Sequence, residues 1–364
     1  MTGDRFAPAF RVEVNGVGLK ADVASAVTEL SVTSEPDTLD HCSLTLANPY
    51  PAMRWTHEPR DADVFREGNG LTVDLGYGKQ LARVFDGEIT AISPSFPESG
   101  TPTVRIEGYT RLHRLRGAAK TRTFVGMTDR EIAQRVADEL KLKLDADDPG
   151  LVHPYVIQFN QTDLAFLLER ARRIRYELRV DERTLRFKRG GEAQQQALSL
   201  AWGAMPGAPS GGGTAEPLRS FNPTMNTLRP VDHVIVRGHD PKKHEPIEAR
   251  AGSGDEDATT GNTRKGVSVS SGAFGARGQI VVDRPVASRT EAANLARALY
   301  TRRALEFVTG TGTAVGLPEL TAGRVVELLG LGRFSGRYYV TQSTHTVGSG
   351  GYVTSFTARS DSLS

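Results

Sequence analysis

Alternating apolar and polar side chains dominate the first part of the chain. Residues 10–14 alternate in this way, and the same pattern recurs along residues 42–46, 71–77 and 104–106. A period of two is typical of strands with one buried face. Asn15-Gly16 predicts a two-residue hairpin turn. We therefore expect residues 1–117 to form a first β-barrel-like domain.

The pattern becomes helical further along. Thr128 and Glu131 have the spacing of a capping box, and apolar residues recur every four positions behind them, at Ile132, Val136 and Leu140. A second apolar stripe follows Thr162-Asp163, at Leu164, Leu167, Leu168, Ala171 and Ile174. Both stripes indicate amphipathic helices. Short strands around a turn at 181–184 complete a predicted α+β module over residues 118–200.

Composition divides the rest of the chain. Residues 203–217 are rich in Gly and Pro, which indicates a linker or loop over residues 201–222. Strands resume near Val231, and residues 223–364 are expected to form a second β-barrel-like domain. This domain is predicted to carry a polar loop at 250–266 and a helix at 288–303, the latter introduced by a capping box at Ser288 and Glu291.

One pattern occurs twice. Residues 70–89 read GLTVDLGYGKQLARVFDGEI and residues 323–338 read GRVVELLGLGRFSGRY. Phe85-x-Gly87 matches Phe334-x-Gly336, and a Gly-Tyr pair follows each copy, at Gly108-Tyr109 and Gly351-Tyr352. Two copies are too few for a solenoid. The repeat predicts a mainly β fold with an α+β insert, in which two related antiparallel β-barrel-like domains accompany a small α/β module.

Charge and composition narrow the class of protein. The chain has 364 residues and a net charge of +2, but residues 111–189 alone carry 18 Lys and Arg against 12 Asp and Glu. A basic segment of this kind can face nucleic acid or an acidic partner, or can be a solvated surface. The one cysteine, Cys42, lies in an alternating stretch and is expected to be a small buried hydrophobe.

Signals for export and for common chemistry are missing from the sequence. No apolar run marks a signal peptide or a membrane span of about 20 residues, so synthesis in the cytoplasm is expected. There is no Gly-Lys-Ser/Thr phosphate loop and no Gly-x-Ser-x-Gly elbow. The histidine cluster Asp232-His233, His239-Asp240 and His244 fits no standard zinc spacing. We therefore expect no catalytic residue, no cofactor and no metal.

An ordered set of segments resembles the phage late control protein D family. These segments are FDGEI (85–89), GYTRLHRL (108–115), TDREIAQRVADELKL (128–142) and QFNQTDLAFLLERARRIRYEL (158–178). The matching positions are Phe85, Gly87, Gly108, Tyr109, Asn160, Asp163, Phe166, Arg170, Phe334, Gly336, Gly351 and Tyr352. We expect structural roles for them: for Asn160, Asp163 and Arg170, a helix start, a cap and a surface or inter-subunit ion pair.

The resemblance implies a structural baseplate or tail hub of a contractile injection system, similar to the N-terminal hub region of VgrG. Such hubs are homotrimers with two tube domains per chain. Their pseudo-sixfold ring joins a hexameric inner tube to a trimeric spike. The implied partners are the inner tube protein, other baseplate proteins and a spike, expected to be a separate protein because no β-helix repeat precedes Ser364. The protein would then reside in a phage tail-like particle, either in the cytoplasm or, after lysis, outside the cell.

Two other functions stay open at this point. One is a peptidoglycan hydrolase of the tail tip, and the other is a DNA-binding tail component that uses the basic segment; for a hub, nucleic acid would be at most a cargo of the lumen. Within the hub hypothesis, the basic segment would face acidic partners. Charge reversal of Arg172 and Arg173 is then expected to impair particle assembly while leaving folding intact.

Overall fold

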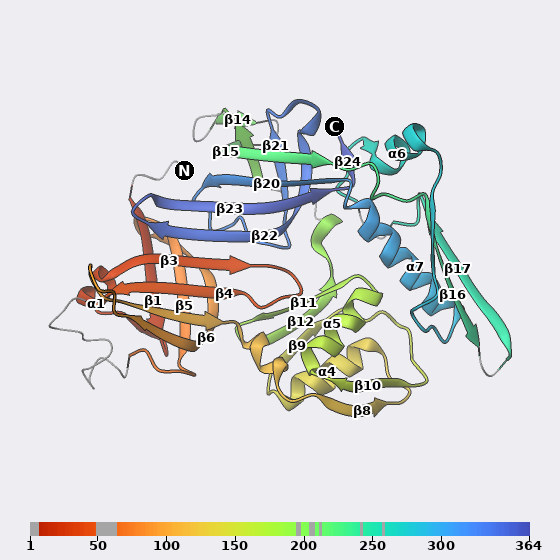
Figure 1. Ribbon diagram of the computed structural model, residues 1–364, viewed down its shortest axis with the longest axis horizontal. Helices are drawn as coiled ribbons and strands as arrows, with labels where there is room; N and C mark the ends of the chain where they lie inside the picture. Colours follow the sequence, from red (N-terminus) through yellow and green to blue (C-terminus); the bar gives the residue numbers. More distant parts are fainter. Residues whose placement is uncertain are drawn as a thin grey trace.

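Strands make up most of the molecule (Figure 1). The computed structural model describes residues 7–48, 64–193, 198–203, 208–210, 213–240, 243–256 and 259–364. The predicted fold class is confirmed: the chain is mainly β, with a closed six-strand barrel, further strands and a small helical module. No helix in these ranges is long and apolar enough to cross a membrane.

The first β unit is built from six strands. They are β1 (Pro8–Val14), β3 (Val27–Ser34), β4 (His41–Ala47), β5 (Gly70–Tyr77), β6 (Gln80–Ser95) and β7 (Thr103–Tyr109). Their order in the sheet is β1-β5-β6-β7-β4-β3. As predicted, Asn15 and Gly16 form a tight turn with positive φ, which joins β1 to β2 (Val17–Gly18); α1 (Ala21–Ser25) follows. Cys42 is fully buried in the core of this unit.

The second β unit is a closed barrel. Its strands are β13 (Leu198–Trp202), β15 (Gly213–Met225), β20 (Val308–Val315), β21 (Val325–Leu329), β22 (Gly336–Gly348) and β23 (Gly351–Ser360). The ladder runs β13-β21-β22-β23-β20-β15 and closes because β15 also pairs with β13. β14 (Ala208–Ser210) pairs with β15, and η3 (Gly332–Phe334) precedes β22.

The two β units share one strand order. Taken in chain order, strands one to six of each unit are hydrogen-bonded in the order 1-4-5-6-3-2. Two bulges also coincide: β6 bulges at Thr90 and β22 at Thr341, while β3 bulges at Thr28 and β15 at Arg219. A further bulge of β6, at Val84 against β5, has no counterpart between β21 and β22. Matching bulges fix the register between the copies, since a bulge is a specific insertion of one residue. In order and direction the duplication therefore extends over five strands, the second to the sixth. The first strand differs, because β1 pairs antiparallel with β5 whereas β13 pairs parallel with β21.

The sequence repeat that suggested this duplication matches equivalent structural positions only in part. Phe85 and Gly87 lie inside β6, whereas Phe334 lies in η3 and Gly336 begins β22. Gly108-Tyr109 ends β7, but Gly351-Tyr352 begins β23. The two Gly-Tyr pairs thus occupy opposite ends of equivalent strands. The order of the strands is repeated, while the matched dipeptides are not equivalent.

The two units are joined into one sheet instead of standing apart. β22 pairs antiparallel with β3, so a 14-stranded sheet runs through both copies. Figure 1 shows β4, β3, β22 and β23 side by side. Val347 of β22 and Tyr352 of β23 pack on the core of the first unit. The second unit therefore completes the core of the first.

The helical module lies between the two units in the chain. Its elements are η1 (Arg111–Arg116), β8 (Lys120–Phe124), α4 (Asp129–Glu139), β9 (Lys143–Ala146), β10 (Val156–Gln161), α5 (Asp163–Arg173), β11 (Tyr176–Asp181), β12 (Thr184–Arg189) and η2 (Gly191–Ala193). Both predicted helices and the first capping box are confirmed: the Thr128 hydroxyl and the Glu131 carboxylate each accept an N–H at the start of α4. Their apolar faces enclose a separate core.

A further α/β layer was not expected from the sequence. It consists of β16 (His233–Asp240), β17 (Glu245–Gly252), β18 (Arg264–Lys265), α6 (Gly266–Phe274), β19 (Gly278–Val281) and α7 (Arg289–Ala304). α7, the helix predicted at 288–303, packs on the sheet β17-β16-β19 and shares a core with it. This inserted module stands between β15 and β20, so β16 and β17 are not barrel strands.

Two expected loops also differ from the prediction. Residues 213–222 of the predicted linker belong to β15, residues 201–202 and 208–210 are strand as well, and residues 204–207 and 211–212 lie outside the described residues. The content of glycine, proline and serine predicted a loop here, but a barrel strand with a free edge can also contain these residues. In the predicted loop 250–266, residues 250–252 end β17, residues 264–265 form β18, and residues 257–258 lie outside the described residues.

Candidate functional site

Asp163 ties three elements of the helical module together. It is the first residue of α5 and is buried. Its carboxylate accepts hydrogen bonds from Lys120 Nζ at 2.7 Å, Arg122 Nη2 at 2.8 Å and Gln158 Nε2 at 2.9 Å. The cap itself is Thr162, whose hydroxyl accepts the Ala165 N–H. A carboxylate in the first turn also faces the positive end of the helix dipole, so Asp163 stabilises the start of α5.

The backbone conformation at residue 160 favours asparagine. It has a φ of 47° in β10, beside a shift in the pairing of β10 with β8. Asparagine tolerates this left-handed region better than most residues. Its N–H donates to Thr121 Oγ1 at 3.2 Å. Phe166, the next motif residue on α5, is buried and stacks on Phe124 at 5.5 Å between ring centroids.

Arg170 corrects the expectation of a surface or inter-subunit ion pair. Its side chain is buried, and its Nε donates to Asp129 Oδ1 at 2.6 Å within the same chain. His153 Nε2 lies 3.1 Å from Asp129 Oδ2 and 2.7 Å from Arg170 Nη2. Burial raises the pKa of Asp129, but the hydrogen bond from His153 and the charge of Arg170 outweigh it and hold that pKa below its ordinary value. This pair fastens α5 to α4.

The remaining motif residues belong to the β units. Phe85 and Tyr352 are buried in the core of the first unit. A Cβ at Gly87 would lie 2.3 Å from the carbonyl oxygen of Tyr109, so the close approach of β6 and β7 requires glycine there. The motif positions are therefore distributed through the scaffold and do not converge on one site.

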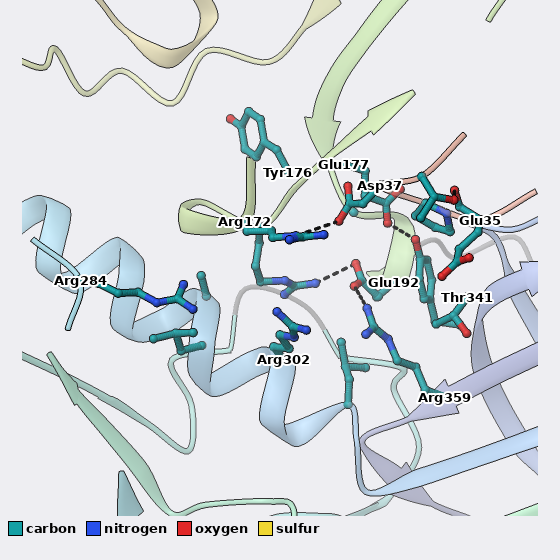
Figure 2. A pocket seen from close by; sticks show the side chains of 18 residues that line it. Glu35, Asp37, Arg172, Tyr176, Glu177, Glu192, Arg284, Arg302, Thr341 and Arg359 are labelled. Atoms are coloured by element: carbon teal, nitrogen blue, oxygen red, sulfur yellow. Dashed lines mark hydrogen bonds and ion pairs between the residues drawn. The ribbon is translucent and has the colours of Figure 1, made fainter. Parts of the chain in front are cut away.

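A charged cavity lies where the two β units, the helical module and the inserted module meet (Figure 2). Its volume is about 260 Å³. The β3–β4 turn supplies Glu35 and Asp37, the end of α5 and β11 supply Arg172 and Glu177, and α7 supplies Arg302. Glu192, Tyr339, Thr341 and Arg359 complete the wall from η2, β22 and β23. Sequence reasoning missed this cavity, because its residues come from segments with no shared motif or spacing.

Three acids in the cavity, Glu192, Glu177 and Asp37, are each held by a group from another element. Glu192 forms ion pairs with Arg175 Nη2 at 2.8 Å and with Arg359 Nη2 at 3.3 Å. Glu177 accepts a hydrogen bond from the Tyr339 hydroxyl, and the Arg359 guanidinium lies over the Tyr339 ring at 5.3 Å. Asp37 accepts the Leu178 N–H at 3.3 Å. The cavity therefore locks β22 and β23 to the helical module.

Burial raises the pKa of two of these acids. It raises the pKa of Glu177 to about 7, although Arg179 and the Tyr339 hydroxyl lower it. It also raises the pKa of Asp37, against the Leu178 N–H and Arg172. A raised carboxyl pKa in a cavity can mark a general acid. Here the same shift follows from packing at a joint between domains.

A second contact holds the inserted module. Arg173, at the end of α5, donates to the Pro285 carbonyl oxygen at 2.5 Å and to Glu291 Oε1 at 2.9 Å. Only about 10% of its side chain is exposed. Arg173 is therefore not free to meet a partner, which corrects the expectation for that residue. Arg172 beside it is half exposed, with Asp37 at 4.0 Å.

Many basic side chains of the segment 111–189 form ion pairs. Arg111 binds Asp86, Arg114 binds Glu88, and Arg122 binds both Glu139 and Asp163. Two of these acids, Asp86 and Glu88, lie outside the segment, so the net charge of its sequence overstates its surface charge. His239 and His244 lie 6.4 Å apart between ring centroids. Within the described ranges, no three His, Cys, Asp or Glu side chains gather as metal ligands.

Comparison with known proteins finds a matching family and solved structures of similar fold. The model of the Alg8 N-terminal domain family matches residues 6–349, whereas no curated protein matches the chain by sequence. The 43 kDa tail protein of prophage MuSo2 from Shewanella oneidensis superposes with a TM-score of 0.70 at 15% identity, covering 98% of this chain and 100% of that one. The tail protein from Neisseria meningitidis MC58 gives 0.67 at 13% identity, with 98% and 97% covered.

A third similar structure belongs to a secretion system. The E. coli c3393 protein is a component of the type VI secretion system and exhibits structural similarity to the T4 bacteriophage tail proteins gp27 and gp5. It superposes with a TM-score of 0.56 at 13% identity, covering 96% of this chain and 76% of that one. At these identities the likeness is one of fold.

Proposed function

Since the chain belongs to the Alg8 N-terminal domain family and has the fold of phage tail proteins, we propose that it is a structural hub of a contractile injection system. Three copies form a ring of pseudo-sixfold symmetry in the baseplate. The ring joins a hexameric inner tube to a trimeric spike, as the resemblance to the late control protein D family implies. The protein acts by assembly and carries out no reaction.

The duplicated β unit is the observation that carries this proposal. Two units with the same strand order and matching bulges lie in one chain, joined edge to edge through β3 and β22. Three such chains present six copies of the unit. A hub of this kind can match sixfold symmetry on one side and threefold symmetry on the other, because closed rings need contacts that repeat around one axis.

The charged cavity supports a mechanical role. Its acids are paired with Arg175, Arg359 and Tyr339, which come from different elements, so they hold parts of the chain together. A hub that bears load needs such joints between its parts. Many basic side chains of the segment 111–189 are likewise engaged in ion pairs, whereas non-specific DNA binding depends on positive charge that is available to phosphates.

The test is the position and stoichiometry of the protein in the particle. Particles purified from producing cells should contain three copies, located by electron microscopy between the inner tube and the spike. Particles that form normally without the protein, or that hold it elsewhere as single copies, would contradict the hub. Zymography on cell walls with the purified chain should show no clearing; clearing would favour the hydrolase.

A further inference from the structure

The joint inside the chain predicts a second joint between chains. β3 and β22 pair with Leu30 opposite Val347, Val32 opposite His345 and Ser34 opposite Ser343. The Thr33 and Thr344 hydroxyls, between these positions, are 3.0 Å apart. This joint connects the second strand of the first unit with the fifth strand of the second unit.

The equivalent two strands have free edges. Residues 91–95 of β6, the fifth strand of the first unit, pair with β7 and, within the described ranges, with no other strand. Residues 220–225 of β15, the second strand of the second unit, likewise pair only with β20 there. Counting from the bulges, Ser93 corresponds to Thr344 and Thr224 to Thr33.

These edges are also accessible. Ser93, Pro94 and Ser95 are exposed on β6, and Asn222 and Thr224 are exposed on β15. Phe96, directly after β6, is 54% exposed. By the same count it corresponds to Val347, which packs on the core of the first unit. A large apolar side chain is thus uncovered at the position where its counterpart is packed.

We propose that the β6 edge of one copy lies against the β15 edge of the next copy, in the register of the β3–β22 joint. The contact places Ser93 beside Thr224 and Phe96 beside Phe221 of the neighbouring chain. It is a heterologous contact, which closes into a ring when the rotation permits. The inference rests on the proposed trimeric hub and names the surfaces that build it.

Two prolines distinguish this joint from the one within the chain. Pro94 corresponds to His345 and Pro223 to Val32, so the two prolines face each other at the middle of the contact. Proline has no N–H to donate to a ladder. The joint between copies therefore has fewer backbone hydrogen bonds than the β3–β22 joint. The same prolines protect the free edges from pairing with unrelated strands.

Engineered cysteines test this contact in assembled particles. Ser93→Cys with Thr224→Cys, after mild oxidation, should convert most of the protein into cross-linked dimers and trimers on non-reducing gels. Either single variant should give none. Thr33→Cys with Thr344→Cys is the matched control: it should form a disulfide within the chain and leave the mass unchanged. Cys42 is buried and gives no background.

The outcomes separate the two proposals. Trimers in the particle without a Ser93–Thr224 cross-link would overturn this contact and leave the hub intact. Absence of trimers from particles of the unmodified chain would overturn both. A second variant tests the apolar part of the contact: Phe96→Asp should abolish trimers, whereas Phe159→Asp, at a phenylalanine of β10 that is 68% exposed, should not. Normal trimers with Phe96→Asp would also contradict the contact.

Discussion

Thr90 and Thr341 occupy the same position in the two β units. Each forms the bulge of the fifth strand of its unit. Each hydroxyl donates to a carbonyl of the adjacent strand, Thr90 to Glu107 at 3.3 Å and Thr341 to Thr357 at 3.2 Å. In both copies the acceptor lies opposite the residue that follows the bulge. A threonine at this point satisfies a carbonyl at the irregularity in the ladder, so the bulge is a built feature of the unit.

Replacing either bulge threonine by valine should therefore have the same effect. Thr90→Val and Thr341→Val keep the shape of the side chain and remove one hydrogen bond, so each should lower the free energy of unfolding by about 1 kcal/mol. Urea denaturation measures the change. Thr101→Val, in the exposed loop between β6 and β7, is the control and should change stability by less than about 0.5 kcal/mol. Bulge variants that match the control would contradict the shared role.

The strand pattern and the capping signals predicted much of this fold. Alternation located β1, β4, β5 and β7, and the Thr128–Glu131 box located the start of α4. The pairing of β3 with β22 could not be predicted, because its partners lie some 300 positions apart and no local pattern encodes that distance. The inserted module could not be predicted for a similar reason. β16 alternates like a barrel strand, and the period of a strand does not indicate which sheet it joins.

The charged cavity was beyond sequence reasoning in a different way. Glu177, Glu192 and Arg359 are ordinary charged residues of strands and turns in the sequence. Their significance comes from burial at a joint of four parts, which depends on the complete tertiary structure. Arg173 shows the same limit: it reads as a surface residue at a helix end, yet it is buried because α7 packs beside α5.

The buried His345 should make the protein less stable in mild acid. Burial lowers the pKa of His345 to about 4, against an ordinary value of 6.5. Between these values the unfolded chain binds a proton that the native chain does not, so stability falls as the pH drops from about 6.5 to 4. The full loss is about 3 kcal/mol. Urea unfolding of His345→Gln should show a shallower acid slope than the wild type, and exposed His244→Gln should not; equal slopes for wild type and His345→Gln would contradict this.

Glu177 should make the protein less stable as the pH rises, which is opposite to the effect of His345. Its pKa is raised to about 7 by burial, so the unfolded chain loses its proton at lower pH than the native chain. Stability then falls as the pH rises from about 4.5 to 7, by up to about 3 kcal/mol. Glu177→Gln removes this term and keeps an acceptor for the Tyr339 hydroxyl. Its unfolding free energy relative to wild type should rise between pH 4.5 and 7.5, whereas exposed Glu98→Gln should show no such trend; a flat difference for Glu177→Gln would refute the assignment.

Arg172 and Arg173 are adjacent in sequence but should respond differently to charge reversal. Arg173→Glu places a carboxylate against Glu291 and the Pro285 carbonyl in a buried joint, so it should cost about 3–5 kcal/mol. Arg172→Glu changes a half-exposed side chain with one acid at 4.0 Å, and should cost about 1 kcal/mol or less. Thermal unfolding followed by circular dichroism measures both. Equal unfolding temperatures for the two variants would contradict this role of Arg173, because the loss of its contact with Glu291 should destabilise Arg173→Glu much more than Arg172→Glu.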